Sequence, residues 1–116
     1  MSHVKRVGEE AFVHHPGADS APLHLLAESA VAGCYTMLNR FFESEYPETL
    51  GVHEDHEGFY VISGRGFFLL EEQEYEIAPG TAMLAPKGKR HGLKKTGNED
   101  LVVFIFHFPD EKGAAV

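Results

Sequence analysis

Short apolar runs, separated by turns that contain glycine or proline, are the feature that most constrains the fold of this chain. The runs are rich in β-branched and aromatic residues, as β-strands are, and they cover residues 31–42, 59–63, 67–72, 74–78, 81–85, 91–95 and 101–108. Turn sequences such as Pro79-Gly80 divide them at the close spacing of an antiparallel sandwich or barrel. No stretch after residue 50 has a convincing helical period. The sequence therefore predicts an all-β fold.

The ends of the chain carry weaker patterns than the middle. We expect residues 14–22 to be a loop and residues 109–116 a tail. Residues 21–32 could form a short helix with small and apolar residues on one face, or an edge strand, and we favour the strand. Because no linker or repeat divides the chain, residues 1–116 are expected to form a single domain with its barrel at about residues 22–108.

Charge and composition narrow the classes of partner. The formal charge is −8 over 116 residues, which argues against nucleic acid and membrane surfaces, since both are bound chiefly through basic groups. A small molecule is the expected ligand. The chain begins without the apolar core of a secretory signal, so a cytoplasmic location is expected. Cys34 is the only cysteine, which leaves no intrachain disulfide.

The strand expected at residues 101–108, with the sequence LVVFIFHF, is apolar on both faces. A strand of this kind is covered on both sides. This pattern favours a homodimer that covers its outer face. The alternative is a strand in the middle of a sandwich with a loop across it.

Histidines and carboxylates gather in residues 51–57, with the sequence GVHEDHE, directly before an expected strand. A zinc-protease helix would need its two histidines four residues apart, whereas His53 and His56 are three apart and run into Gly58. That class of site is excluded. Ligand spacing here has to be judged on a strand, where neighbouring side chains point to opposite faces.

Two spacings in the sequence resemble the motifs of the cupin superfamily. In the second motif, five residues separate Gly80 from Pro86, one separates Pro86 from Gly88, and two separate Gly88 from His91. The resemblance implies a double-sheet jelly-roll β-barrel that takes ligands at its mouth or in its interior. The turns that bracket residues 81–85 also bring His91 to the start of the next strand, facing the interior.

The first motif is matched in part. Six residues separate Glu57 from Gly64, and His53 falls where the family's second histidine lies. Gly51 occupies the place of the first histidine, and Lys95 replaces an asparagine that often follows the second motif. The resemblance therefore implies a ligand set in which one family residue is missing.

Three residues are the candidate metal ligands: His53, Glu57 and His91. If they converge, two imidazoles and one carboxylate suit Fe, Mn, Ni or Zn and leave coordination positions open. The alternative is a polar pocket in which the three side chains bond to one another without metal. His56 is a possible additional ligand only if the turn breaks strand alternation; otherwise it is an exposed histidine.

Candidate substrate contacts follow from position near His91 and within the expected barrel. Five basic residues cluster there, at positions 87, 89, 90, 94 and 95, and Lys89 and Arg90 could attract an anionic substrate. A solvated loop is the simpler explanation. Tyr60 and His107 are further candidates, although sheet packing and a satisfied core histidine are the alternatives. The resemblance implies a dioxygenase, isomerase or decarboxylase; the competing hypothesis is a non-catalytic binding or sensor domain.

Overall fold

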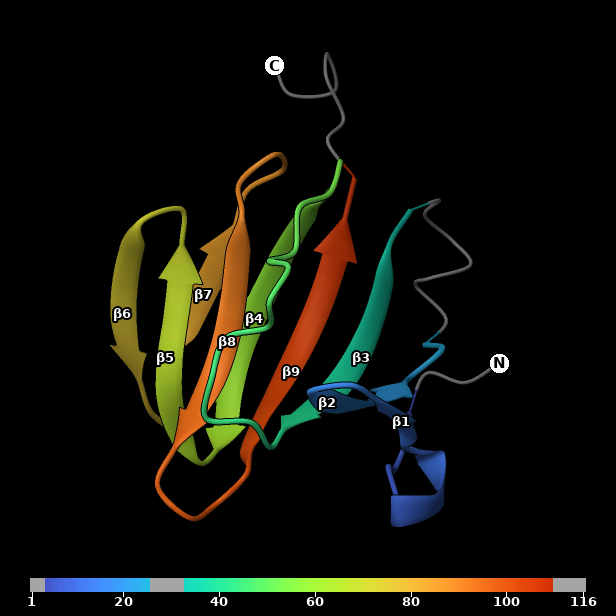
Figure 1. Cartoon of the computed structure of the whole chain (residues 1–116). Coiled ribbons are helices and arrows are strands. Elements are labelled where there is room, and N and C mark those ends of the chain that lie inside the picture. Colours follow the sequence, from blue (N-terminus) through green and yellow to red (C-terminus); the bar gives the residue numbers. More distant parts are fainter. Residues whose placement is uncertain (1–3, 26–32, 110–116) are drawn as a thin grey trace.

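The computed structural model of the chain describes residues 4–25 and 33–109, which form two antiparallel β-sheets (Figure 1). The large sheet has the order β1-β2-β3-β9-β4-β7 and consists of β1 (Val13–His15), β2 (Ala18–Pro22), β3 (Tyr35–Phe41), β9 (Leu101–Phe108), β4 (His56–Ser63) and β7 (Ala82–Ala85). The small sheet has the order β6-β5-β8 and consists of β6 (Gln73–Ile77), β5 (Arg65–Leu70) and β8 (His91–Thr96). A 3-10 helix, η1 (Glu9–Ala11), precedes β1. The predicted all-β jelly-roll class is confirmed.

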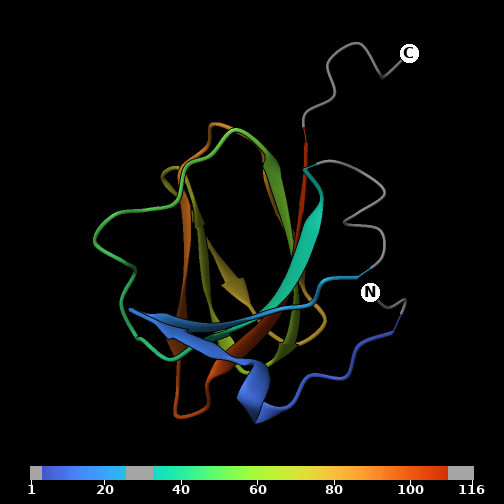
Figure 2. The same ribbon diagram turned by 90° about the vertical axis from the view of Figure 1, so that its right-hand side faces the viewer.

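The two sheets form opposite walls of the barrel, as the side view shows (Figure 2). Side chains from both sheets fill the space between these walls. The buried core consists of Phe59, Val61, Phe68, Ile77, Ala85, Leu93, Leu101, Val103 and Ile105. The central strands β4 and β9 alternate between buried and more exposed residues along most of their length, so each has one face in the core and one face outside.

Each apolar run that we expected to be a strand contains one, from β3 to β9. The prediction of a loop at residues 14–22 is wrong. Most of that segment forms the hairpin of β1 and β2, whose second strand pairs with β3. The hairpin turns at Pro16 and Gly17, and Gly17 takes a φ of 88°, which glycine adopts without steric cost. Of the strand expected at 21–32, residues 26–32 lie outside the described part.

The turns on either side of β7 position the first residue of β8. Gly80 and Gly88 have φ angles of 93° and 76°, in the left-handed region that favours glycine. The segment between β3 and β4 then passes beside β8, where Gly51 forms an isolated antiparallel bridge with His91. Two backbone hydrogen bonds make this bridge, from the Gly51 amide to the His91 carbonyl and back, at 2.9 and 3.0 Å. These hydrogen bonds join His91, the last residue of the second predicted motif, to Gly51, the first residue of the first motif.

Within residues 4–25 and 33–109, no helix combines the length and the apolar character that crossing a membrane would demand.

Candidate metal centre

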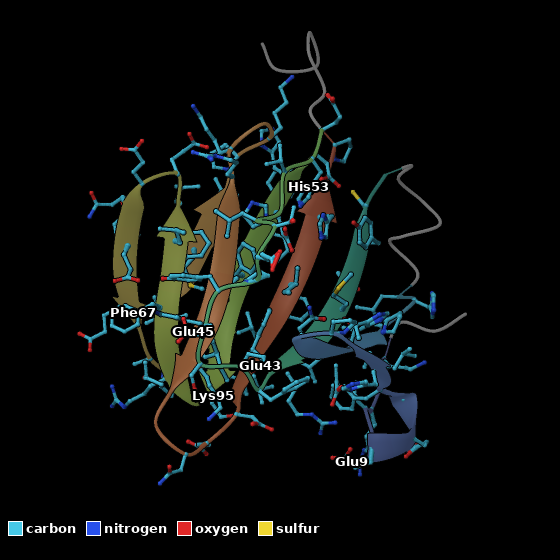
Figure 3. The ribbon with its side chains drawn as sticks, in the orientation of Figure 1. Glu9, Glu43, Glu45, His53, Phe67 and Lys95 are labelled. Carbon is cyan, nitrogen blue, oxygen red and sulfur yellow. The ribbon has the colours of Figure 1, made fainter. Side chains whose placement is uncertain are left out.

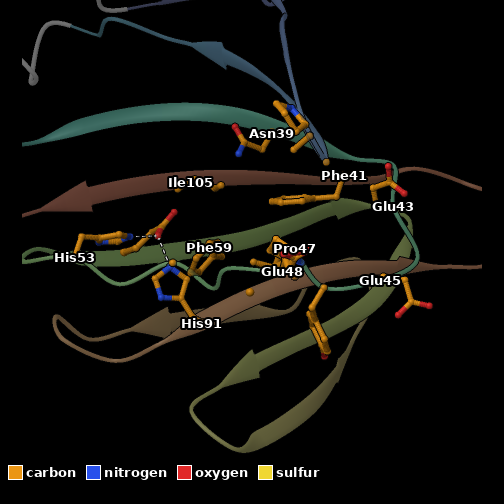
Figure 4. Close-up of a pocket in the computed structure, with 18 residues that line it drawn as sticks. Asn39, Phe41, Glu43, Glu45, Pro47, Glu48, His53, Phe59, His91 and Ile105 are labelled. Carbon is orange, nitrogen blue, oxygen red and sulfur yellow. Dashed lines mark hydrogen bonds and ion pairs between the residues drawn. The ribbon is translucent and has the colours of Figure 1, made fainter.

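His53, Glu57 and His91 converge in the structure. Figure 3 shows His53 near one end of the barrel, and Figure 4 shows His53 and His91 close together. His53 lies in the loop before β4, Glu57 is the second residue of β4, and His91 is the first residue of β8. Oε1 of Glu57 lies 3.0 Å from Nε2 of His53 and 2.8 Å from Nε2 of His91. One ligand atom from each residue lies within 4.8 Å of those of the other two, a separation at which a single ion can contact all three. The structure thus brings together the three side chains predicted as ligands.

In His53 and His91, the ring nitrogen that points away from Glu57, Nδ1, has its own hydrogen-bond acceptor. Nδ1 of His53 donates to Oδ1 of Asp55 at 2.7 Å, and Nδ1 of His91 donates to the backbone carbonyl of Lys89 at 3.0 Å. A neutral imidazole carries one proton, so these bonds leave a lone pair on each Nε2. Each Nε2 faces the Glu57 carboxylate, which only accepts hydrogen bonds, so this position takes either a metal cation or a second proton that makes the ring an imidazolium. The donor set fits a divalent transition metal.

A third histidine contacts the same carboxylate from the neighbouring strand. His107 of β9 pairs with Glu57 in the sheet register, and its Nε2 lies 3.2 Å from Oε2 of Glu57. Its Nδ1 donates to Oδ2 of Asp55 at 3.1 Å. The ring stacks on Tyr35, with ring centroids 4.1 Å apart and an interplanar angle of 9°. His107 is therefore a buried histidine with a carboxylate at each nitrogen, and to donate to both it has to be the doubly protonated imidazolium.

The electrostatics of the cluster favour an ionised Glu57. Burial alone would raise the pKa of Glu57, but hydrogen bonds from His107 and His91, together with their charge, lower it to about 2. For His91, burial acts to lower the pKa, and the bonds to Glu57 and to the Lys89 carbonyl outweigh it and raise the pKa. The pKa of His107 is raised for the same reason, with Glu57 and Asp55 outweighing burial. The carboxylate is ready to bind a cation in the ordinary pH range.

A cavity of about 520 Å³ adjoins the triad and extends away from it between the sheets (Figure 4). Its wall is mainly apolar, with Phe41, Phe59, Leu93 and Ile105 among the lining residues. Figure 4 places His53 and His91 at one end, and Glu43 and Glu45 at the other. Among the described residues, no lysine or arginine lines it. The three candidate ligands thus form one end of a space large enough for a small organic molecule.

The cupin domain model matches residues 44–107, which is more than half of the chain and includes all three predicted ligands. The chain belongs to the cupin family. An uncharacterised protein of Methanocaldococcus jannaschii is 26% identical over 96 residues, covering 82% of this chain and 68% of that protein.

Solved cupin-fold structures resemble the chain at low sequence identity. The plu4264 protein of Photorhabdus luminescens has a TM-score of 0.78 and 16% identity, covering 97% of this chain and 91% of that one. A predicted oxalate decarboxylase of Thermotoga maritima has a TM-score of 0.76 and 19% identity, covering 92% and 99% respectively. At these identities the likeness shows the fold alone.

Gly51, which stands where the cupin motif has its first histidine, lies directly beside His91. A Cβ atom added at Gly51 would lie 3.2 Å from Nε2 of His91, the nitrogen that faces Glu57. A side chain at this position would make a tight contact with the His91 ring, which would have to shift. The glycine leaves that side of the triad open, and it also lines the cavity.

The other predicted site residues lie elsewhere. His56 is on the opposite face of β4 from Glu57, where its Nδ1 accepts a hydrogen bond from the Lys87 amide at 3.1 Å and its ring contacts Phe108. Tyr60 is 47% exposed on the same outer face. The structure therefore leaves His56 and Tyr60 outside the triad and outside the cavity lining.

The basic cluster also stays outside the cavity. Lys89 and Arg90 are exposed, and the Arg90 guanidinium lies 4.0 Å from the Glu71 carboxylate. Neither residue lines the cavity, so an anionic substrate would find no cation from them there.

Asp55, which was not among the predicted site residues, bonds to both His53 and His107. The one signal for it was its place among the histidines of residues 51–57, and spacing alone does not separate Asp55 from its neighbour Glu54.

Proposed function

We propose that this cupin binds one divalent transition metal through His53, Glu57 and His91 and is an enzyme that acts on a small organic substrate in the adjoining cavity. The observation that supports this is the direction of the two imidazoles. Their Nδ1 atoms are occupied by Asp55 and the Lys89 carbonyl, so their Nε2 atoms face Glu57 at the end of the cavity. When bound, a metal with open positions would polarise a substrate oxygen as a Lewis acid.

The lining of the cavity favours a substrate that is uncharged or cationic. Its charged side chains away from the triad are carboxylates, Glu43, Glu45 and Glu48, which would repel an anion. The basic residues beside His91 in the sequence had suggested an anionic substrate, but the carboxylates of the cavity lining favour an uncharged or cationic one.

One further feature of the lining describes a suitable substrate. The apolar wall, with Phe41, Phe59 and Ile105, would exclude water and contact a carbon skeleton. Asn39 lines the same cavity, but its Oδ1 is enclosed by protein atoms and faces no open space, so this acceptor selects no group on the substrate.

One observation favours a second candidate, a non-catalytic ligand-binding domain. Among the described side chains at the triad end of the cavity, the titratable groups are the proposed metal ligands themselves. No separate acid or base is available there for proton transfer. A protein of this kind would bind its ligand on the metal without turnover.

Metal content is the first test. Protein purified without chelators or metal-affinity resin should contain close to one transition-metal ion per chain by elemental analysis, and dialysis against a chelator should remove it. A preparation with no transition metal, and no binding of added Mn²⁺, Ni²⁺ or Zn²⁺ by calorimetry, would contradict the proposal.

A matched ligand series tests the substrate class. Oxamide, oxamate and oxalate share one skeleton and carry increasing negative charge. The affinity of each compound for the metal-loaded protein is divided by its affinity for the free metal ion. This ratio should fall from oxamide to oxamate to oxalate. Replacing Glu43, Glu45 and Glu48 by glutamine should reduce this weakening. An unchanged series would show that the glutamates do not select the substrate, and turnover of any bound ligand would separate the enzyme from the binding domain.

A further inference from the structure

Four side chains form a closed ring of hydrogen bonds and ion pairs at the candidate metal centre. His53 contacts Asp55 at 2.7 Å, Asp55 contacts His107 at 3.1 Å, His107 contacts Glu57 at 3.2 Å, and Glu57 contacts His53 at 3.0 Å. Only two of the four, His53 and Glu57, belong to the triad. The ring therefore joins two proposed ligands to two residues that have no assigned role.

Asp55 determines which nitrogen of His53 faces the triad. A carboxylate only accepts hydrogen bonds, so the ring must donate from Nδ1, which leaves the lone pair on Nε2. Without this acceptor, His53 is free to carry its proton on Nε2, where it would block coordination. Carboxylate partners of metal-bound histidines commonly have this effect.

His107 restrains the other ligand of the ring. Its Nε2 contacts Oε2 of Glu57, while Oε1 of the same carboxylate faces His53 and His91. The His107 ring is itself fixed, because its side chain is 6% exposed and it stacks on Tyr35. Rotation of Glu57 would break this contact, so the carboxylate is kept with one oxygen directed toward the triad.

We propose that Asp55 and His107 are positioning residues, which hold His53 in the tautomer and Glu57 in the orientation that the metal requires. This inference rests on the proposed metal site. The structure does not assign His107 as a fourth ligand. His107 belongs to a different group of possible ligands, His53, Asp55 and His107, which shares only His53 with the group of His53, Glu57 and His91.

Asp55→Asn is the first test, because it changes the hydrogen bonds and almost nothing in volume. An amide offers an acceptor to one ring and a donor to the other. If the NH₂ group faces His53, the proton of that ring moves to Nε2; if it faces His107, the restraint on Glu57 is weakened. In either orientation, Zn²⁺ affinity measured by competition with a chelating dye should fall by about 10- to 100-fold.

The chain contains a matched control outside the cavity. Nδ1 of His14 contacts Oδ1 of Asp19 at 2.7 Å, the same separation as in the pair of His53 and Asp55. Asp19→Asn should leave Zn²⁺ affinity unchanged. If Asp55→Asn weakens affinity no more than Asp19→Asn does, while the parent protein binds Zn²⁺, the positioning role is wrong and the metal site stands. A parent that binds no metal would overturn both.

Two variants test His107 without relying on Asp55. His107→Leu removes both polar contacts, whereas His107→Gln retains an N–H donor that can reach Glu57. We expect His107→Leu to lose affinity about tenfold and His107→Gln to restore part of it. Equal affinities for parent, His107→Leu and His107→Gln would exclude a positioning role for this residue.

Nuclear magnetic resonance of the parent protein gives a readout that a purely structural role would not produce. Long-range ¹H–¹⁵N correlation separates histidine tautomers. In the Zn²⁺-loaded parent, His53 should carry its proton on Nδ1 and bind the ion through Nε2, and the Nδ1 signal should weaken in Asp55→Asn. Binding through Nδ1 of His53 and His107 would place the ion in the second group and overturn the proposal, even if Asp55→Asn fails to fold.

Discussion

The two faces of strands β4 and β9 carry different chemistry. On the inner face, Glu57 and His107 form a cross-strand pair within the candidate metal centre. On the outer face, the neighbouring pair joins Gly58 and Phe106, and the phenyl ring lies so close to the glycine that an added Cβ would overlap it. A shift of one residue in either strand would exchange the two faces.

Within the described residues, the outer face of three adjacent strands is mainly apolar and carries no Asp, Glu, Lys or Arg. Outward positions of β4, β7 and β9 are His56, Gly58, Tyr60, Ile62, Ala82, Leu84, Val102, Phe104, Phe106 and Phe108. In a chain of net charge −8, a surface without Asp or Glu can meet a second copy of itself without repulsion between carboxylates. The comparison suggests that one pair of strands serves two purposes, metal binding inside and assembly outside.

The largest expected effect is the loss of metal in His91→Ala. The substitution removes one of three protein ligands from an open site, and two ligands hold a divalent ion poorly. Elemental analysis should find no stoichiometric metal, and the variant should still melt cooperatively.

His56→Ala is the control for that variant, because His56 lies on the outer face of β4 and is absent from the triad. It should retain metal. Full occupancy in His91→Ala would contradict the metal site, and loss of metal in His56→Ala would show that the two faces are not independent.

Substitutions at two neighbouring residues of β4 compare how much the inner and outer faces contribute to the free energy of unfolding. Phe59 is 1% exposed in the core, and Tyr60, the next residue, is 47% exposed outside. Phe59→Ala leaves a large cavity and should lower the free energy of unfolding by about 3 to 5 kcal/mol. Tyr60→Ala should cost about 1 kcal/mol or less. Chemical denaturation measures both, and similar costs would mean that Tyr60 is buried in solution.

The alternation that separates these faces is what the sequence predicted best. A period of two in LVVFIFHF indicated a strand, and it also placed His107 on the face of Val103 and Ile105. The turns at Gly80 and Gly88 predicted that His91 would start a strand directed inward. These features were accessible because they depend on local sequence.

The parts that were missed depend on contacts distant in sequence. The hairpin of β1 and β2 contains His14, His15, Asp19 and Ser20, a composition typical of loops, and its second strand is completed by pairing with β3. Pro16 and Gly17 of this hairpin line the cavity. Likewise, Asp55 and His107 are 52 residues apart, and only the pairing of β4 with β9 brings His107 to Glu57 and Asp55.

The oligomeric state tests the role of the outer face. We propose a homodimer in which the outer faces of two chains meet, and light scattering at micromolar concentration should give the mass of two chains. Ile62 is 49% exposed on this face. Ile62→Glu would bury a carboxylate at the interface and should shift the protein to monomer, with metal content unchanged. A parent protein that is already monomeric would refute the interface.

The smallest expected effect is the pH dependence of the metal-free protein, which depends on the inner face alone. The pKa of Glu57 is lowered from 4.5 to about 2, so its stabilising contribution is complete above pH 4.5 and is lost as the pH falls toward 2. The pKa values of His91 and His107 are raised above 6.5, so their contribution is complete below pH 6.5 and is lost as the pH rises through the raised values.

The lowered pKa of Glu57 and the raised pKa values of His91 and His107 arise from the same contacts. The stabilising energy of these contacts is therefore counted once, not once for each partner. The metal-free parent should therefore gain most from the cluster between about pH 4.5 and pH 6.5. Thermal melting of parent and Glu57→Gln across the pH range measures that gain as a difference, which cancels the effect of the chain's overall negative charge. With metal bound, His91 is a neutral ligand that no longer loses a proton, so the loss on the alkaline side should disappear. A difference that does not change with pH would show that the inner cluster is not ionised as described here.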